Sequence, residues 1–345
     1  MVRCILKRKT TKKKGTVKIF VLLLTGLLFL SILEQPTLAA KDQFKLGILM
    51  ANDARHDPVE GFKNGMTSFS SHGIYEFIYT ILNAKNQKDK LPELARKLIA
   101  DKPGIAIAAG GIEADALMAA TRNTSIPIVF LSVSSTIERG LVSSIMVPDK
   151  NITGIETNDT NITAKRLWFI KRILPKARTV FCFHIPSNVP SVESIKIARS
   201  KVDKLGLKLI VKEVETIDEI KKITESLSRD KVDVILMNPV AVIHGAMKNI
   251  ILPKAMTEKI PVFGYGMTSI KKGAFASYAG SRYANGRQAA RLAHKIVHGE
   301  SPKNIPIETP EQYEFIINKW MVKNLGLKLP SNFYKMADKI VEIKF

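Results

Sequence analysis

The strongest constraint on the fold is an alternation of short apolar runs and longer segments of helical period. We expect buried strands, bounded by Gly, Pro or Asp, at residues 44–50, 75–82, 105–109 and 126–131. We expect helices between them at residues 58–70, 90–100 and 114–121. Strands that alternate with helices predict parallel β-α-β units with right-handed crossovers.

The same alternation then begins again, after a short polar stretch at residues 151–155. Helices are expected at residues 164–173, 191–205, 217–228 and 242–255, and strands at 179–183, 208–214, 232–237 and 261–264. Two successive sets with similar element order predict an α/β protein of two similar, doubly wound parallel-sheet lobes.

The end of the chain adds more than the second lobe needs. A strand at 274–278, a helix at 283–297, a strand at 313–318 and a short helix before Gly326 follow it. These extra elements are accommodated best if the chain crosses from lobe 2 back to lobe 1 and then returns. We therefore assign residues 41–154 and 279–312 to lobe 1, and residues 155–278 and 313–345 to lobe 2.

The first forty residues have the order of a secretory signal peptide. Basic residues come first, residues 19–33 are mostly apolar, and small residues end the segment. Fifteen helical residues span only about 22 Å, less than the hydrocarbon core of roughly 30 Å. We expect cleavage after Ala39 or Ala40 and export, with an uncleaved anchor as the alternative.

Charge and cysteine content narrow the class of protein further. The segment to be removed carries +7 of the net charge of +22, and the rest is spread beside acids on expected helix faces. Aromatic residues make up only 7%, so a nucleic-acid surface is not indicated. Cys182 is the single cysteine after residue 40, and no Cys follows the apolar run as in an acylated lipoprotein. We expect a periplasmic protein without an attached lipid, which is held at the inner membrane only if the N-terminal segment is not cleaved.

No catalytic or metal-binding motif assembles. The sequence has no G-x-S-x-G, H-E-x-x-H, paired C-x-x-C or Walker A motif. His294 and His298 end a basic helix, where contact with the helix C-terminus is favoured over a metal. We expect no enzyme activity, no metal and no cofactor.

Polar or Gly-rich turns follow six of the expected strands. In open parallel sheets, ligands bind beyond the carboxyl ends of the strands. Each residue alone is as readily explained as the cap of the next helix, but six turns at one cleft predict a binding site. The candidates are Asn52, Asp53, Gly110, Gly111, Ser132, Ser134, Ser135, His184, Asn188, Asn238 and Tyr265, with Arg282 discussed below.

A series of spaced motifs carries a family resemblance. They include residues 126–130, 139–142, 151–154, 173–175, 204–206, 259–263, 272–274, 286–288, 305–310 and 324–327. In this order they closely resemble ABC-transporter substrate-binding proteins of the tryptophan/tyrosine-uptake branch. The resemblance implies a type I periplasmic-binding fold with three hinge crossings, near Gly154, Tyr278 and Glu314, and a ligand enclosed between the lobes. It also implies no enzymatic activity and delivery of a small-molecule solute to an ABC permease with a separate ATPase. We expect a monomer.

The resemblance also bears on the ligand. Relatives that bind amino acids carry Asp at the places of Val240, Gly266 and near Ser281, and an α-ammonium needs such acids. All three are absent here, and Arg282 follows the last. We therefore expect a polar or anionic solute without a free α-ammonium, held by Ser134, Ser135, Asn238 and the Gly110 and Gly111 amides. Asp53 could replace the missing acids.

Alternatives remain open at this point. Arg282 either contacts the solute or pairs with an acid across the hinge. The whole chain could instead be a membrane-anchored ligand-sensing ectodomain or, less favoured, an exported α/β enzyme.

Overall fold

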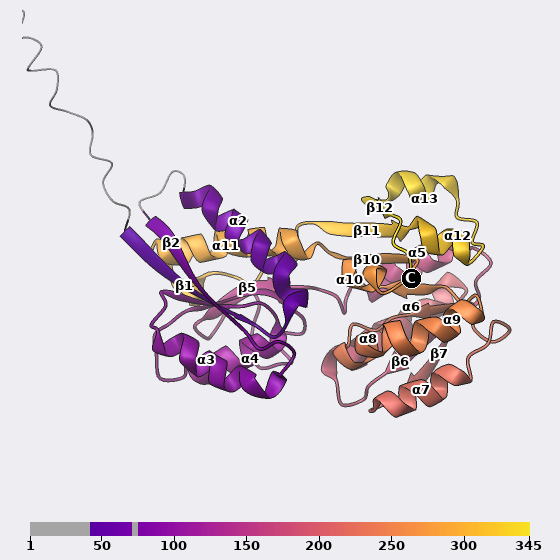
Figure 1. The fold of residues 1–345 in the computed structure, drawn as a ribbon, viewed down its shortest axis with the longest axis horizontal. Helices are drawn as coiled ribbons and strands as arrows, with labels where there is room; N and C mark the ends of the chain where they lie inside the picture. The colour runs from indigo at the N-terminus through magenta and orange to yellow at the C-terminus, as the bar shows by residue number, and fades with distance from the viewer. Residues whose placement is uncertain (1–41, 71–74) are drawn as a thin grey trace, which may run out of the picture. The chain divides into compact units, whose positions relative to one another are not determined.

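The computed structural model describes residues 42–70 and 75–345, which form two α/β lobes, each built on its own sheet (Figure 1). The expected signal peptide and its cleavage site lie outside the described residues. Within those residues, no helix combines the length and the apolar composition needed to cross a membrane.

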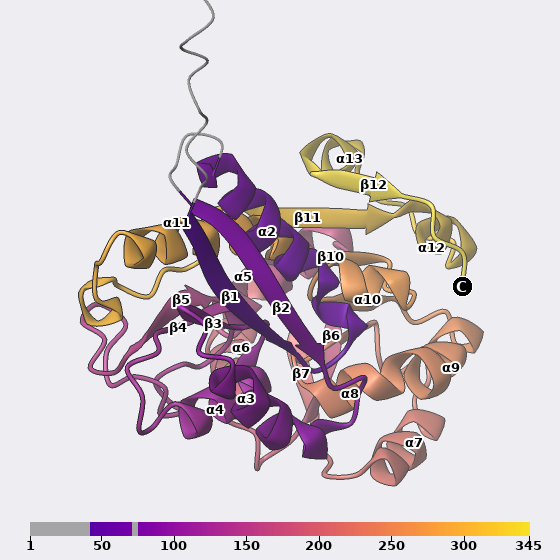
Figure 2. The same ribbon diagram turned by 60° about the vertical axis from the view of Figure 1, so that its left-hand side comes forward.

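Lobe 1 contains a five-stranded sheet of order β2-β1-β3-β4-β5. Its strands are β1 (Asp42–Met50), β2 (Tyr75–Asn83), β3 (Ile105–Ala108), β4 (Ile128–Val133) and β5 (Ile152–Glu156). Its helices are α2 (His56–Ser70), α3 (Leu91–Ala100), α4 (Gly111–Ala120) and the later α11 (Arg282–Val297). Helices α2 and α11 pack side by side on one face, and α3 and α4 on the other (Figure 2).

Strand β3 shows why its sequence is apolar at every position. Ile105 and Ile107 belong to the core beneath α2 and α11, whereas Ala106 and Ala108 belong to the core beneath α3 and α4. Because both faces of the sheet are covered, successive side chains are all buried. The strand therefore lacks the alternation of a half-exposed strand.

Lobe 2 contains a seven-stranded sheet of order β12-β11-β10-β9-β8-β6-β7. Its strands are β6 (Thr179–His184), β7 (Lys208–Glu213), β8 (Val234–Leu236), β9 (Val262–Gly264), β10 (Ala276–Gly280), β11 (Tyr313–Asn318) and β12 (Lys339–Val341). Its main helices are α5 (Thr163–Ile173), α6 (Val189–Val202), α7 (Ile217–Glu225), α8 (Ala241–Ala246), α9 (Leu252–Thr257) and α10 (Met267–Lys271). Two short helices, α12 (Lys319–Asn324) and α13 (Ser331–Met336), complete it.

The sheet of lobe 2 is not parallel throughout. Strand β11 runs antiparallel to β10, with Tyr278 opposite Phe315. It enters the sheet directly from lobe 1, without a crossover helix that would return it in the parallel sense. The expected fold class, two α/β lobes built on parallel sheets, is confirmed, and β11 is an antiparallel strand within the second sheet.

The chain passes between the two sheets three times. It leaves lobe 1 after β5, leaves lobe 2 after β10 to form α11, and returns through β11. At the first and third passages Ile155 and Glu308 form a parallel bridge. Gly154 has a φ of 153°, and a Cβ there would lie 2.2 Å from the Phe130 carbonyl oxygen, so only glycine fits this strand. The residue bounds assigned to the lobes remain a prediction.

Candidate functional site

Tyr265, in the turn after β9, lies at the centre of a group of charged side chains. It is buried, and the Arg166 guanidinium lies 5.9 Å from its ring centroid. The charges of Arg55, Asp159 and Arg282 also act on its phenol. Burial raises the pKa of Tyr265 above its ordinary value, so the phenol stays protonated and can donate a hydrogen bond. Both lobes therefore contribute to one charged region.

Arg166 on α5 joins two of the passages between the lobes. Its Nε donates to the Tyr278 carbonyl oxygen on β10 at 2.8 Å, and its Nη1 donates to the Asp159 carbonyl oxygen at 2.7 Å. Its Nη2 pairs with the Asp159 carboxylate at 2.5 Å, and the Arg166 side chain is only 1% exposed. The expected site residues did not include Arg166. We refer to these contacts as the Arg166 clasp.

In lobe 1, Arg55 lies against the start of α4. Its Nε donates to Glu113 Oε1 at 2.8 Å, and the same oxygen accepts from the Ala51 backbone N–H. Glu113 is fully buried. A Cβ on Gly110 would lie 2.5 Å from the Arg55 Cζ, so the glycine makes room for this guanidinium. Gly110 therefore has a structural role that the sequence did not indicate.

Arg139 is placed against Gly111 as Arg55 is placed against Gly110. Its Nη1 donates to Asp115 at 2.9 Å and its Nε to the Ser134 carbonyl oxygen at 3.1 Å. A Cβ on Gly111 would lie 2.8 Å from the Arg139 Cζ. Burial raises the pKa of Asp115, and the Arg139 charge opposes this shift. Both arginines near the N-terminus of α4 are thus already paired with acids.

A pocket lies where the second passage leaves lobe 2. The centre of a water molecule can range over about 70 Å³ within it. Its lining comes from the turn after β9, the start of α11 and the edge of the sheet of lobe 2, with one residue of α2. The lining residues are Asp57, Gly266, Met267, Thr268, Ala279, Gly280, Ser281, Arg282, Tyr283, Glu314 and Lys339.

Arg282 is the cation of this pocket that lacks an ion pair. It is partly buried, and among the described residues no carboxylate oxygen lies within 4 Å of its guanidinium. Lys339, by contrast, pairs with Glu314 at 2.8 Å. Burial, and then the nearby Arg55 charge, lower the pKa of Arg282 from its ordinary value. An arginine so placed has unused donors and a net attraction for anions.

The three positions where acids were expected in amino-acid binders separate in space. Gly266 and Ser281 line the pocket of Arg282, and Ser281 caps α11 by accepting from the Ala284 N–H. Gly266 has a φ of 110°, a conformation in which an Asp would be strained. Val240 lies in the apolar core of lobe 2 instead. Two of the three positions therefore line one pocket.

The other candidate residues of lobe 1 mainly form hydrogen bonds with the backbone or with neighbouring side chains. Asn52 accepts from the Ala54 N–H, and Asp53, 80% exposed, accepts from the Asn83 amide at 2.8 Å. Among the described residues, the ion-pair partner of Asp53 is His56 rather than Arg282. Ser132 accepts from Asn285 of α11 at 3.2 Å.

Ser135 is buried and adopts a left-handed φ of 57° beside Ser134. For a residue other than glycine this φ is uncommon, and such strain often accompanies a functional turn.

Three candidates of lobe 2 meet at one residue, Ser191 on α6. Its Oγ lies 2.9 Å from His184 Nδ1 and accepts from the Asn238 amide at 2.8 Å. Asn188 caps α6 by accepting from the Ser191 N–H at 3.1 Å. The structure thus brings His184, Asn188 and Asn238 together, but as a hydrogen-bond network that fixes the strand ends.

Other reactive groups are not arranged for chemistry. Burial raises the pKa of the Cys182 thiol to about 12, and its Sγ lies 3.1 Å from the Leu236 carbonyl oxygen. His294 stacks on Phe69, and His298 contacts the His294 carbonyl oxygen at the end of α11. In the part of the chain that the structure describes, no three His, Cys, Asp or Glu residues gather as metal ligands.

Comparisons with known proteins agree on one family. A family model described as ABC transporter substrate binding protein matches residues 46–341. The tyrosine-binding protein of Clostridioides difficile (strain R20291) is 29% identical over 262 residues, which are 76% of this chain and 73% of that protein.

Solved structures share the fold. The ABC domain in complex with L-Trp from Streptococcus pneumonia has a TM-score of 0.75 at 18% identity, covering 87% of this chain and 100% of that one. The ligand-free, open structure of a substrate-binding protein with adhesive properties from Clostridium difficile has a TM-score of 0.69 at 26% identity, covering 87% and 100%.

Proposed function

Because this chain belongs to the ABC transporter substrate-binding protein family, we propose that it captures a small solute bearing a carboxylate, which Arg282 pairs with. The chain is a solute-binding subunit and not an enzyme. The finer proposal concerns the charge of the solute. It rests on one observation: the partly buried Arg282 guanidinium lacks an acid within 4 Å among the described residues.

The surrounding arginines support this assignment by contrast. Arg55, Arg139 and Arg166 are each paired with an acid of the protein at 2.5–2.9 Å. A carboxylate of the solute would complete the same pattern at Arg282, as a charge-assisted and bidentate pair. The Tyr265 phenol, which stays protonated, lies close enough to Arg282 for the Arg282 charge to act on it.

The same geometry disfavours an ammonium group. Asp159 is committed to Arg166, and Glu314 is committed to Lys339. Asp57 lines the pocket but is exposed, so its charge is screened by water. A desolvated ammonium with no available acid beside it is costly, because burial of an unpaired charge is strongly unfavourable.

Calorimetric titration of the purified protein with matched pairs of solutes tests the proposal. The pairs are tyrosine with desaminotyrosine and tryptophan with indolepropionate, which differ only in the ammonium. We expect the deaminated member of at least one pair to bind more tightly, by roughly tenfold or more. Tighter binding of both amino acids would refute the preference.

A second candidate function is the binding of an aromatic amino acid. The observation that favours it is the similarity to a tyrosine-binding protein and to a structure in complex with L-Trp. An amino acid also carries a carboxylate for Arg282, so the two candidates differ only in how the pocket treats the amine. The matched pairs separate them.

Capture is proposed to proceed by hinge closure about the three passages. A solute that bridges both lobes stabilises a closed form through its higher affinity for that form. We further propose that a monomer delivers the solute to an ABC permease driven by a separate ATPase.

Export is expected from the basic, apolar and small order of residues 1–40. N-terminal sequencing of protein recovered from cells expressing the full chain should read from Ala40 or Lys41. Recovery of Met1 or Val2 on membrane-bound material would instead favour an anchored, ligand-sensing ectodomain.

A further inference from the structure

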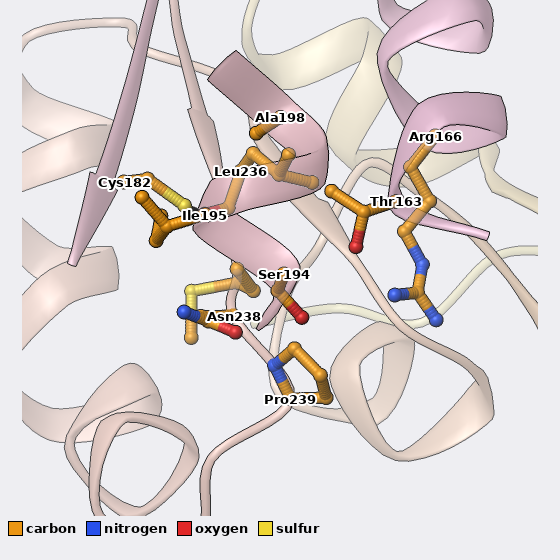
Figure 3. Close-up of a pocket in the computed structure, with 10 residues that line it drawn as sticks. Thr163, Arg166, Cys182, Ser194, Ile195, Ala198, Leu236, Asn238 and Pro239 are labelled. Atoms are coloured by element: carbon orange, nitrogen blue, oxygen red, sulfur yellow. Dashed lines mark hydrogen bonds between the residues drawn. The ribbon is translucent and has the colours of Figure 1, made fainter. Parts of the chain in front are cut away.

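A small, partly open cavity lies in lobe 2, apart from the pocket of Arg282. It is formed between α5, α6 and the turn after β8, and Figure 3 shows its lining. The centre of a water molecule can range over about 10 Å³ within it. That is close to the smallest space that holds one buried water, and too small for a larger occupant.

Three polar side chains on the cavity wall lack a hydrogen-bond partner. Thr163 Oγ1, Ser194 Oγ and Asn238 Oδ1 are buried, and each of these residues is less than 5% exposed. In Figure 3 the three oxygens turn toward the same gap. Each comes from a different element, so the convergence does not arise from local sequence.

The orientation of Asn238 is fixed by its own contacts. Its Nδ2 donates to the Phe183 carbonyl oxygen at 3.3 Å and to Ser191 Oγ at 2.8 Å. A flipped amide would lose the bond to Phe183, because two oxygens would then face each other and neither can donate. Asn238 therefore presents an acceptor to the cavity, and the two hydroxyls can each donate or accept.

We propose that this cavity is a binding site for one water molecule, held by Thr163, Ser194 and Asn238. Unpaired buried polar groups are costly, and buried waters in proteins make about three hydrogen bonds to such groups. The three side chains supply that number. A water here satisfies all three at once.

The water would connect parts of lobe 2 that matter for solute capture. Thr163 lies one turn before Arg166 on α5, and Arg166 also lines the cavity. Asn238 lies in the turn after β8, next to Pro239. The bridge would thus hold the helix that carries the Arg166 clasp against the strand end of lobe 2.

A high-resolution crystal structure and a double-mutant cycle test the site together. We expect one density peak within hydrogen-bond distance of all three oxygens, retained when solute is bound. Thr163→Val and Ser194→Ala should each lower the midpoint of thermal unfolding. The double variant should lower it by clearly less than the sum of the two, because both hydroxyls share one water. Ser200→Ala is the control, since Ser200 is exposed on the same helix and bonds the Ile197 carbonyl oxygen.

Three outcomes would overturn the proposal. They are an empty cavity in a map that shows other buried waters, additive effects of the two substitutions, and an atom of the solute in place of the water. A fall in stability for Ser200→Ala as large as that for Ser194→Ala would also contradict it.

Discussion

Arg166→Met should lower the free energy of unfolding of the protein by about 3–5 kcal/mol, the largest effect of any single change considered. The substitution keeps the aliphatic bulk but removes the guanidinium that pairs with Asp159 and bonds Tyr278. Asp159, whose side chain is 13% exposed, is then left without its cation. Chemical denaturation, followed by circular dichroism, measures the change.

Arg172→Met is the matched control for this loss. Arg172 lies on the same helix, is exposed and only approaches the Trp168 ring, at 5.6 Å. Its replacement should change stability by less than about 1 kcal/mol. An equal loss in both variants would show that helix α5, rather than the clasp, is sensitive.

The conservative change Arg166→Lys connects the clasp to motion. Lysine retains the charge but cannot bond Asp159 and Tyr278 together in the planar geometry of a guanidinium. Small-angle scattering should show the wild-type protein becoming more compact with bound solute. In Arg166→Lys the solute should bind more weakly, because two passages no longer move together. An unchanged scattering profile of the wild type with solute bound would count against hinge closure.

Arg282→Gln should weaken the binding of a carboxylate solute by roughly ten- to a hundredfold. A hydrogen bond to a charged group contributes about 1.5–3 kcal/mol, and each 1.4 kcal/mol is a factor of ten in affinity. Isothermal titration with the tighter member of a matched pair measures this change. Stability should rise or stay constant, because the variant removes a partly buried charge that the protein itself leaves unpaired.

Arg287→Gln controls for net charge, since Arg287 is exposed on the same helix. Its affinity should stay within about twofold of the wild type, because an exposed charge is screened. If Arg282→Gln also leaves the affinity unchanged, Arg282 is not a solute contact.

The fold could largely be predicted from the sequence, because the central strands of both sheets are covered on both faces. Strand β3 is apolar at every position, and β4 is fully buried with Ser132 as its one polar residue, which marks both as buried strands even without alternation. The antiparallel direction of β11 could not be predicted from the sequence, because the direction of a strand that returns from another lobe depends on the path of the chain.

Less of the site than of the fold could be predicted from the sequence, and Arg166 shows why. In sequence it stands among Lys165, Lys171 and Arg172 on a helix whose basic residues suggest a solvated face. Its partner carbonyl oxygen on Tyr278 is 112 residues away, so only the fold brings them together. A basic residue at a position that continues the apolar stripe of Leu167 and Ile170 was the available signal.

Gly110 and Gly111 show a second limit of the sequence. Two adjacent glycines before a helix suggest amides offered to an anion, which is the geometry of many anion sites. Here both lie beneath guanidiniums, those of Arg55 and Arg139. The sequence could not distinguish an anion site from a close approach of side chains, because both require glycine.

The charge of the Arg282 pocket is tested most directly by introducing one acid within it. Ser281→Asp keeps a good helix cap, and Ser281→Asn keeps the cap without the charge. Titration of both variants with tyrosine and desaminotyrosine gives one ratio of affinities for each. We predict that Ser281→Asp shifts this ratio at least tenfold toward the amino acid, while Ser281→Asn leaves it near the wild-type value. An equal ratio in all three proteins would contradict the claim that this pocket selects its solute by charge.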